Sequence, residues 1–319
     1  MTPASPATPR RVALVVPVFN EEPVLPELFA RLDGVRASEP GVDWACIFVN
    51  DGSRDRSAEM IAARAESDRA MELVDLSRNF GHQAALMAGI ARAGELGVDA
   101  VVTMDADLQD PPELIPELLA KWRTGSAVVL AVRRSREERG LRRAGFDLFH
   151  RLFNRFSDFP IVANTGTFGL MNAEALEALV ALPERHRFFP GLRGWVGFPT
   201  AQIFYDRKDR AAGTPAQTLR RLVTYAFDGM LSFSYLPLRM LTYVGLAVSG
   251  FGFALGTFFI VRRLLGIEIA FTGFTTLVTL TLFLGGIQLV GIGVIGEYLA
   301  RVYDEVKKRP LYIVRRRKP

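Results

Sequence analysis

Cysteine and histidine are scarce in this chain. Its 319 residues contain one cysteine, Cys46, and three histidines. A single cysteine excludes an internal disulfide framework and a zinc site built from several cysteines, and it fits a reducing compartment. His82, His150 and His186 lack metal-ligand spacing, so we interpret them as structural or surface residues. The N-terminus lacks the apolar core and cleavage site of a signal peptide, and we expect residues 1–10 to form a loose tail.

Charged residues are missing from two long segments near the C-terminus. Residues 240–261 and 269–296 contain no Asp, Glu, Lys or Arg. A helix that crosses a bilayer needs about 20 mostly apolar residues. The sequence therefore predicts transmembrane helices at 237–263 and 269–298. The alternative is a pair of buried core helices, but two such runs in tandem are rare in soluble domains.

Basic residues are unevenly distributed around these segments. The net charge is +5, and the hairpin between the two predicted spans carries only Arg262 and Arg263. The basic residues after Tyr298 are Arg301, Lys307, Lys308, Arg309, Arg315, Arg316, Arg317 and Lys318. The positive-inside rule predicts an inner (cell) membrane protein with the tail 299–319, the N-terminal domain and both termini in the cytoplasm. The tail is either solvated or docked on anionic headgroups. We expect a membrane and anionic small molecules as partners, and no nucleic acid.

Residues 11–215 alternate between short apolar runs and segments with helical spacing. The expected strands are 12–18, 44–49, 71–76, 100–104 and 127–132. The expected helices between them are 22–35, 58–65, 83–93 and 112–122. This alternation predicts an α/β domain with a mostly parallel sheet that is covered on both faces. Ligands of such sheets bind beyond the carboxyl ends of the strands.

Polar clusters follow the predicted strands at that edge. Asp105 and Asp107 come directly after the fourth strand, and two such carboxylates suit Mg²⁺ or Mn²⁺. Asp51 follows the second strand, where its carboxylate can accept hydrogen bonds from a base or ribose. The alternatives are a solvated turn at Asp105 and an ordinary Asp-Gly turn at Asp51, with Ser53 or Asp55 capping the next helix.

Four motifs in order carry a family resemblance. They are Val15–Glu22 (VVPVFNEE), Asn50–Ser53 (NDGS), Ser77–Gln83 (SRNFGHQ) and Asp105–Pro112 (DADLQDPP). These motifs resemble the inverting family 2 glycosyltransferases. With two C-terminal spans and Gly296-Glu297-Tyr298, residues 11–315 resemble the membrane-bound polyprenyl-phosphate glycosyltransferases. That group includes bactoprenol glucosyltransferases, bacterial-type dolichol-phosphate mannose synthases and undecaprenyl-phosphate aminoarabinose transferases.

The resemblance implies a GT-A-type (Rossmann-like) domain at 11–215 and a role for each matching residue. The nucleotide would be bound by Pro17, Asn20, Glu21, Asp51, Ser53, Arg78 and Asp105. Asp107 would be the metal ligand, with Asp105 nearby, and these two carboxylates and Arg133 would be the catalytic residues. Gln109 would lie by the sugar or metal, and Arg133 would approach the acceptor phosphate. Beyond the resemblance, further candidates for the sugar or acceptor are Arg136, Asn164, Arg207 and Arg210. Arg136 and Arg139 are equally consistent with a solvated charge run.

The chain also departs from the family pattern. Asn50 replaces the first acid of the second motif, and residues 164–170 lack both acids and the arginine of an Asp-Ala-Gly-Asp-Phe-Arg-Leu stretch. Residues 213–217 lack the lysine and tyrosine of a Gly-x-Ser-Lys-Tyr stretch. If the first missing acid were a catalytic base, Asn164 would not replace it. A lipid phosphate needs no base, however, because its oxygens are already ionised near neutral pH, with a second pKa of about 6.

Together these features predict an inverting transferase of the cell envelope. It would move a sugar from a UDP- or GDP-type donor to a polyprenyl (undecaprenyl) phosphate, with an amphipathic segment at 216–236 lying in the headgroup plane beside the acceptor. One alternative is a catalytically degenerate nucleotide-sugar-binding partner of a flippase or polymerase. Another is transfer to a hydroxyl acceptor, for which no strong base replaces Asn164. The resemblance also suggests a homo-oligomer.

Overall fold

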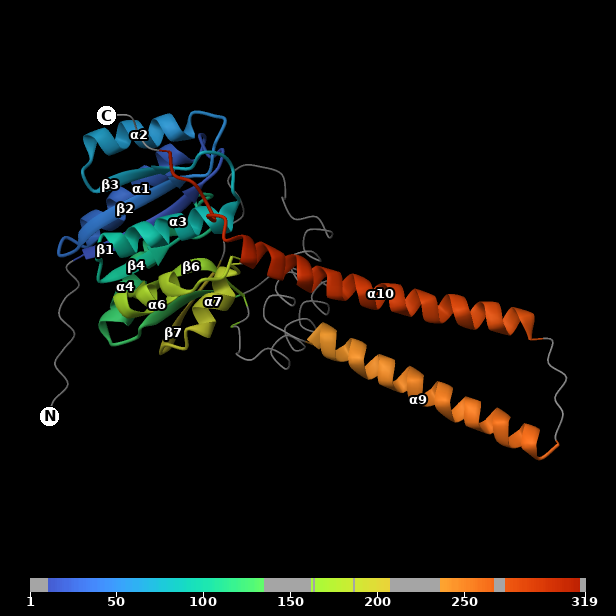
Figure 1. Ribbon diagram of the computed structural model, residues 1–319. Helices are drawn as coiled ribbons and strands as arrows, with labels where there is room; N and C mark the ends of the chain where they lie inside the picture. The colour runs from blue at the N-terminus through green and yellow to red at the C-terminus, as the bar shows by residue number, and fades with distance from the viewer. Residues whose placement is uncertain are drawn as a thin grey trace. The chain divides into compact units, whose positions relative to one another are not determined.

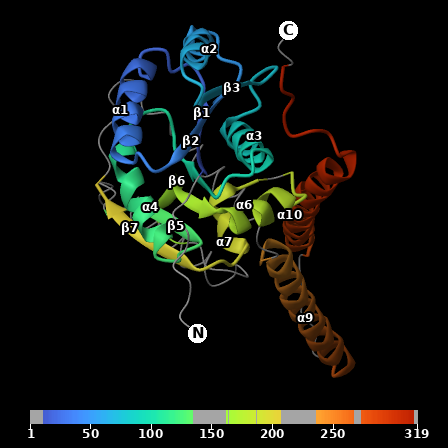
Figure 2. The same cartoon turned by 90° about the vertical axis from the view of Figure 1, so that its left-hand side faces the viewer.

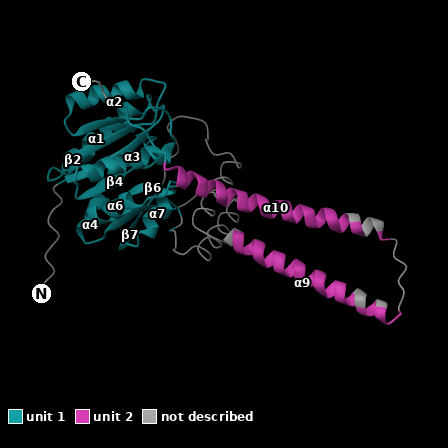
Figure 3. Cartoon of the chain, in the orientation of Figure 1, with its two compact units in different colours: residues 1–154, 159–222, 309–319 teal, residues 155–158, 223–308 magenta. Residues whose placement is uncertain are grey.

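The computed structural model describes residues 11–134, 162, 164–185, 187–206, 236–266 and 273–315. The chain divides into two compact units (Figure 3). The first unit contains residues 1–154, 159–222 and 309–319, and the second contains residues 155–158 and 223–308. Each unit is described by itself below.

The first unit is built on a seven-stranded sheet with the order β3-β2-β1-β4-β6-β5-β7 (Figure 1). The strands are β1 (Arg11–Val18), β2 (Asp43–Asn50), β3 (Met71–Asp75), β4 (Ala100–Thr103), β5 (Val128–Arg133), β6 (Thr165–Asn172) and β7 (Thr200–Tyr205). Only β6 among them runs against the others, since it pairs antiparallel with both β4 and β5. The predicted α/β class with a mostly parallel sheet is confirmed.

Helices cover both faces of this sheet (Figure 2). They are α1 (Leu25–Ser38), α2 (Ser57–Ser67), α3 (His82–Glu95), a short 3₁₀ helix η1 (Pro112–Leu114), α4 (Ile115–Arg123), α6 (Ala173–Ala181) and α7 (Phe189–Trp195). Helices α1 and α4 pack on the face that presents Leu14, Val16 and Phe48. Helix α3 lies on the opposite face, where Gly89 approaches Val15. Apolar strand residues on both faces account for the nearly continuous hydrophobic runs of β1 and β2.

The nine predicted strands and helices of residues 11–132 all occur, with shifts at their ends. The last part of the domain was not predicted, and β6 shows why. Gly166 and Gly169 interrupt its apolar pattern, which weakens a strand signal. A side chain at Gly169 would place its Cβ 2.6 Å from the Val129 carbonyl oxygen. Strand β6 therefore needs glycine at the point where β5 comes close. Because glycine has a low strand propensity, the sequence alone did not predict a strand there.

The second unit contains two long apolar helices, α9 (Leu236–Leu264) and α10 (Phe274–Lys307). Leu238–Phe258 and Thr279–Lys307 are long and apolar enough to cross a membrane. Leu246, Phe253 and Leu289 are 71, 80 and 70 % exposed. Exposed apolar surface of this extent is typical of a membrane segment or an interface, not of core helices. Helix α10 continues to Lys307, past residue 298, where the sequence predicted the second span to end.

Several predicted features lie outside the described residues. They are the tail 1–10, the amphipathic segment 216–236 except Leu236, residues 213–217, the end of the tail at 316–319, and Arg136, Arg139, His150, His186, Arg207 and Arg210.

Candidate active site

The structure brings the four sequence motifs to one edge of the sheet. Strands β1, β2, β3 and β4 are parallel, so their carboxyl ends meet there. Val18 pairs with Asn50, and Asn50 pairs with Asp75. The loops that follow these strands therefore start side by side. Pro17 is buried within β1, opposite Val49, one step before this edge.

The first and second motifs are joined by hydrogen bonds. The amide of Asn20 donates to Ser53 Oγ at 3.0 Å, and Asn20 Oδ1 accepts from the amide of Arg54 at 2.8 Å. The amide of Glu21 donates to Ser57 Oγ at 3.0 Å. Asn20 has a φ of 56°, a left-handed conformation that asparagine adopts more readily than most residues. Asn20 and Ser53 thus organise the edge of the predicted nucleotide pocket.

Asp51 joins the second motif to the third. Its side chain is almost fully buried, and its two oxygens accept from the amides of Phe80, at 2.7 Å, and Gly81, at 2.9 Å. Burial raises the pKa of Asp51, and these two amide bonds oppose that shift. Gly52 is required beside it, because its φ is 68° and a Cβ there would lie 2.6 Å from the backbone of Arg78. Asp51 is therefore a structural anchor as well as a candidate contact to the base.

Arg78 lies at the exposed rim of the third motif. Its guanidinium stands 4.0 Å from the centre of the Phe80 ring and donates to the Asn79 carbonyl at 2.8 Å. An exposed cation at the carboxyl edge of a parallel sheet suits an anionic ligand.

His82, which the sequence predicted to be a structural or surface residue, has a side chain that is 45 % exposed and lies beside Asp105. Nε2 of His82 lies 2.9 Å from Oδ1 of Asp105. Burial opposes the charged imidazolium, but the hydrogen bond and charge of Asp105, and the charges of Asp51 and Asp107, raise the pKa of His82. The three carboxylates thus act on one imidazole. The sequence did hold one indication of this position, because His82 belongs to the third motif.

An unusual turn follows β4 and presents the second carboxylate. Leu108 has a φ of 57°, a conformation that costs free energy for a bulky residue. Its side chain is buried in the hydrophobic core, which holds the turn in place. The amide of Gln109 donates to Asp107 Oδ1 at 3.1 Å. This turn sets Asp107 and Gln109 near Asp105.

Arg133, at the end of β5, is held by two buried partners that the sequence did not single out. Its Nε donates to the Tyr205 hydroxyl at 3.1 Å, its Nη2 lies 3.6 Å from Asp110 Oδ1, and the Tyr205 hydroxyl donates to Asp110. Burial opposes its charge, but the negative charges of Asp110 and Asp105 raise the pKa of Arg133. Asp110 lies within the fourth motif, whereas Tyr205 belongs to the unpredicted strand β7.

The departure at residues 164–170 adjoins this arginine. The amide of Arg133 donates to the Asn164 carbonyl at 3.2 Å, and Asn164 has a φ of 60°. A Cβ on Gly166 would lie 2.9 Å from Arg133 Nη2. Gly166 therefore leaves room for the Arg133 side chain, and the Asn164 carbonyl fixes the Arg133 backbone.

The chemistry of Asp105 and Asp107 fits a divalent cation. No group of three or more His, Cys, Asp or Glu that is arranged to hold a metal occurs among the described residues. Mg²⁺, however, usually binds through one or two carboxylates and completes its shell with water and substrate phosphates. Two hard oxygen ligands beside a phosphate-bearing substrate would satisfy that requirement.

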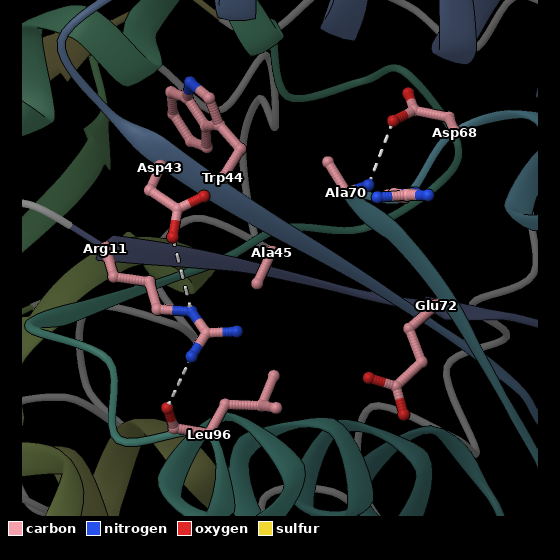
Figure 4. Close-up of a pocket in the computed structure, with 9 residues that line it drawn as sticks. Arg11, Asp43, Trp44, Ala45, Asp68, Ala70, Glu72 and Leu96 are labelled. Atoms are coloured by element: carbon pink, nitrogen blue, oxygen red, sulfur yellow. Dashed lines mark hydrogen bonds and ion pairs between the residues drawn. The ribbon is translucent and has the colours of Figure 1, made fainter.

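A cavity of about 410 Å³ lies elsewhere, at the amino-terminal ends of β1 and β2 (Figure 4). Arg11 begins β1 there, and it lies 3.7 Å from Asp43 and donates to the Leu96 carbonyl at 3.0 Å. Ligands of parallel sheets bind at the opposite, carboxyl edge. This cavity is therefore not the candidate active site.

Comparison with known proteins adds independent findings. The model of glycosyl transferase family 2 matches residues 13–180. An uncharacterized glycosyltransferase of Synechocystis sp., sll0501, is 43 % identical over 95 % of this chain and 94 % of its own. The SfII prophage-derived bactoprenol glucosyl transferase of Shigella flexneri is 41 % identical over 96 % of this chain and 98 % of its own.

Among solved structures, mannosyl-3-phosphoglycerate synthase from Rubrobacter xylanophilus is similar with a TM-score of 0.49 and 20 % sequence identity. The match covers 74 % of this chain and 75 % of that one. At that identity the likeness says nothing about substrate. The family match covers more than half of the chain, and the close relatives cover nearly all of it. Together with the motifs at the carboxyl edge of the sheet, these matches establish that the chain belongs to glycosyltransferase family 2 and is a glycosyltransferase.

Proposed function

We propose that this glycosyltransferase moves a sugar from a UDP- or GDP-type nucleotide donor to a polyprenyl phosphate in one inverting step. The observation that carries the proposal is the pairing of two centres at one sheet edge. His82 lies 2.9 Å from Asp105, the charges of Asp51 and Asp107 also act on its imidazole, and Asp105 acts in turn on the mostly buried Arg133. The two candidate membrane spans and the bactoprenol relatives support a lipid acceptor.

The donor would bind across the loops that follow β1, β2 and β3. The hydrogen bonds from Asn20 to Ser53 and from Phe80 and Gly81 to Asp51 preorganise these loops. Preorganised polar groups stabilise developing charge without reorganising during the reaction. Arg78, at the rim, would contact the donor phosphates. Asp105 and Asp107 would hold Mg²⁺ or Mn²⁺, which supplies positive charge to the diphosphate when bound.

The acceptor would bring its own nucleophile. An oxygen of the lipid phosphate attacks the anomeric carbon and forms the new C–O bond. The bond from that carbon to the donor diphosphate breaks, and the nucleoside diphosphate leaves with the electron pair. Arg133 would orient the acceptor phosphate and offset the repulsion between two anions. No base is required, since a phosphate monoester is already ionised near neutral pH, with a second pKa of about 6.

The replacement at Asn164 supports this acceptor. A hydroxyl acceptor needs a base to remove its proton, whereas this position provides an amide and a backbone carbonyl that binds Arg133. We further propose, from the basic residues after Tyr298, that the first unit and both termini face the cytoplasm at the inner membrane.

A transfer assay with the full-length chain tests the proposal. Membranes would be incubated with undecaprenyl phosphate, Mg²⁺ or Mn²⁺, and a panel of radiolabelled UDP- and GDP-sugars. We expect label in the lipid from one donor, and Asp107→Asn should lower the rate by about 100-fold, as loss of a key electrostatic group does. Asp43→Asn is the matched control, since this carboxylate lies at the opposite edge of the sheet. Label that enters only a hydroxyl acceptor, or an Asp107→Asn variant with full activity, would contradict the proposal.

A further inference from the structure

Residues 309–315 follow α10 in the chain but belong to the first unit (Figure 1). We name them the C-terminal strap. The amide of Ser77 donates to the Ile313 carbonyl at 2.8 Å, and the amide of Arg315 donates to the Asp75 carbonyl at 2.7 Å. Val314 and Leu76 form an antiparallel bridge between these bonds. The strap thus makes a short antiparallel pairing at the end of β3, the edge strand of the sheet.

Side chains reinforce this docking. Arg315 Nη2 donates to the Ser77 carbonyl at 3.1 Å, and its Nη1 lies 3.5 Å from Asp75 Oδ2. Arg185 donates to the Arg309 carbonyl at the other end of the strap. Tyr312 is partly buried, and burial raises its pKa. The sequence predicted that the basic tail is either solvated or docked on lipid headgroups. In the structure, residues 309–315 of that tail pack on the first unit instead.

The strap contacts the residues that hold the second motif. Asp75 Oδ1 accepts from Asn50 Nδ2 at 2.7 Å, and the amide of Leu76 donates to the Asn50 carbonyl at 2.9 Å. Asn50 is buried, and its Oδ1 accepts from the amide of Ser53 at 3.1 Å. A continuous series of hydrogen bonds therefore runs from Arg315 through Asp75 and Asn50 to Ser53, whose hydroxyl binds the first motif.

The strap also braces the third motif, which begins where it binds. Ser77 bonds to the strap, and Phe80 and Gly81 bond to Asp51. Residues 75–81 thus lie between the strap and the Asn50–Gly52 loop. The outer side of an edge strand carries main-chain groups without a strand partner, and the strap supplies one for the end of β3.

We propose that the C-terminal strap is a positioning element for nucleotide binding, with Arg315 and Asp75 acting through Asn50 on the loop at 50–54. The proposal rests on the proposed function only in that the donor nucleotide binds at this loop. The strap directly follows the second candidate span in the sequence. Preorganisation of this kind raises affinity by lowering the cost of ordering the loop.

Two deletions in the full chain, reconstituted in nanodiscs, separate this role from a general structural one. Deletion of 309–319 removes the strap, whereas deletion of 316–319 removes charge but keeps it. We expect loss of the strap to raise the Kd for UDP or GDP by about tenfold and to speed amide exchange at residues 50–54, with the acceptor KM within about twofold. The shorter deletion should change neither. Addition of a peptide with the sequence of residues 309–319 should restore affinity.

Point variants test the mechanism more finely. Arg315→Pro removes the amide that binds the Asp75 carbonyl and should approach the effect of the deletion. Arg315→Ala should weaken nucleotide binding by about threefold, and Arg315→Lys should recover part of that loss. A deletion that lowers the Tm while nucleotide Kd and exchange at 50–54 stay unchanged would overturn the inference. If the intact chain bound neither UDP nor GDP, the proposed function would fail, and exchange at 50–54 would still show whether the strap orders the loop.

Discussion

The two sides of the candidate site are built in different ways. The side proposed to bind the nucleotide, called the nucleotide side, comprises residues 17–22, 50–57 and 75–83. Its loops are held mainly by bonds between backbone amides and short side chains. On the arginine side, Arg133 is held by side chains 23 and 72 residues away in the sequence, Asp110 and Tyr205. The Asp110 and Arg133 side chains are 0 and 15 % exposed.

This difference separates two tasks. Loops held by separate bonds to individual backbone amides can order around a donor, and their stability is local. A buried charged group in a hydrogen-bonded network is fixed in one geometry, and loss of one partner leaves the other uncompensated. The nucleotide side is thus suited to binding and release, whereas the arginine side offers one rigid cation to an incoming anion.

Arg133→Ala should break the arginine side with the largest effect. Removal of the guanidinium takes away the cation offered to the acceptor and leaves Asp110 buried without it, so we expect the rate of transfer to fall by about 100-fold or more. Donor binding should remain within about threefold, because the hydrogen bonds and ion pair of Arg133 go to Tyr205, Asp110 and the backbone of Asn164. Transfer rates and nucleotide Kd measured on the same preparation provide the check.

Tyr205→Phe is the graded control for that variant. It keeps the ring that packs against Phe168 but removes the hydroxyl between Arg133 and Asp110. The acceptor KM should rise by about tenfold while the fold survives. An acceptor KM unchanged in both variants would show that Arg133 does not face the acceptor.

Two glycine substitutions, one on each side of the site, are expected to have effects of intermediate size on binding. Gly52→Ala places a Cβ 2.6 Å from the backbone of Arg78 at a positive φ, so the nucleotide side must shift and donor Kd should rise by about tenfold. Gly166→Ala places a Cβ 2.9 Å from the end of the Arg133 side chain and should raise the acceptor KM alone. Calorimetry with nucleotide and initial rates at varied lipid concentration distinguish the two. If both variants changed the same parameter, the two sides would not be separate.

The same difference explains which parts of the site the sequence predicted. Each of the four motifs is an unbroken stretch of sequence that follows a predicted strand. The strand pattern and the family resemblance therefore predicted Asp51, Asp105 and Asp107 at one edge of the sheet. His82 is at the surface, as predicted, but its place beside Asp105 had no signal of its own, because the two residues are 23 apart in the sequence. Tyr205 had no signal, since its strand was not predicted and its partners are distant in sequence. The strap was equally hidden, because only the folded chain brings residue 315 to Asp75.

The smallest expected effect concerns the Glu22–Arg56 pair, which joins the first and second motifs. Glu22 Oε1 accepts from Arg56 Nε at 2.7 Å, and this bond lowers the pKa of Glu22 from its ordinary value of 4.5. Because the folded pKa lies below the unfolded one, the pair stabilises the fold above pH 4.5 and loses that contribution as pH falls through the folded pKa. Glu22→Gln should therefore lower the Tm slightly at pH 7, since exposed pairs contribute little, and the difference should shrink as the pH falls below 4.5. Thermal unfolding between pH 7 and acidic pH measures this. A Glu22→Gln difference that did not shrink as the pH fell would mean that the carboxylate charge of Glu22 does not hold the two loops together.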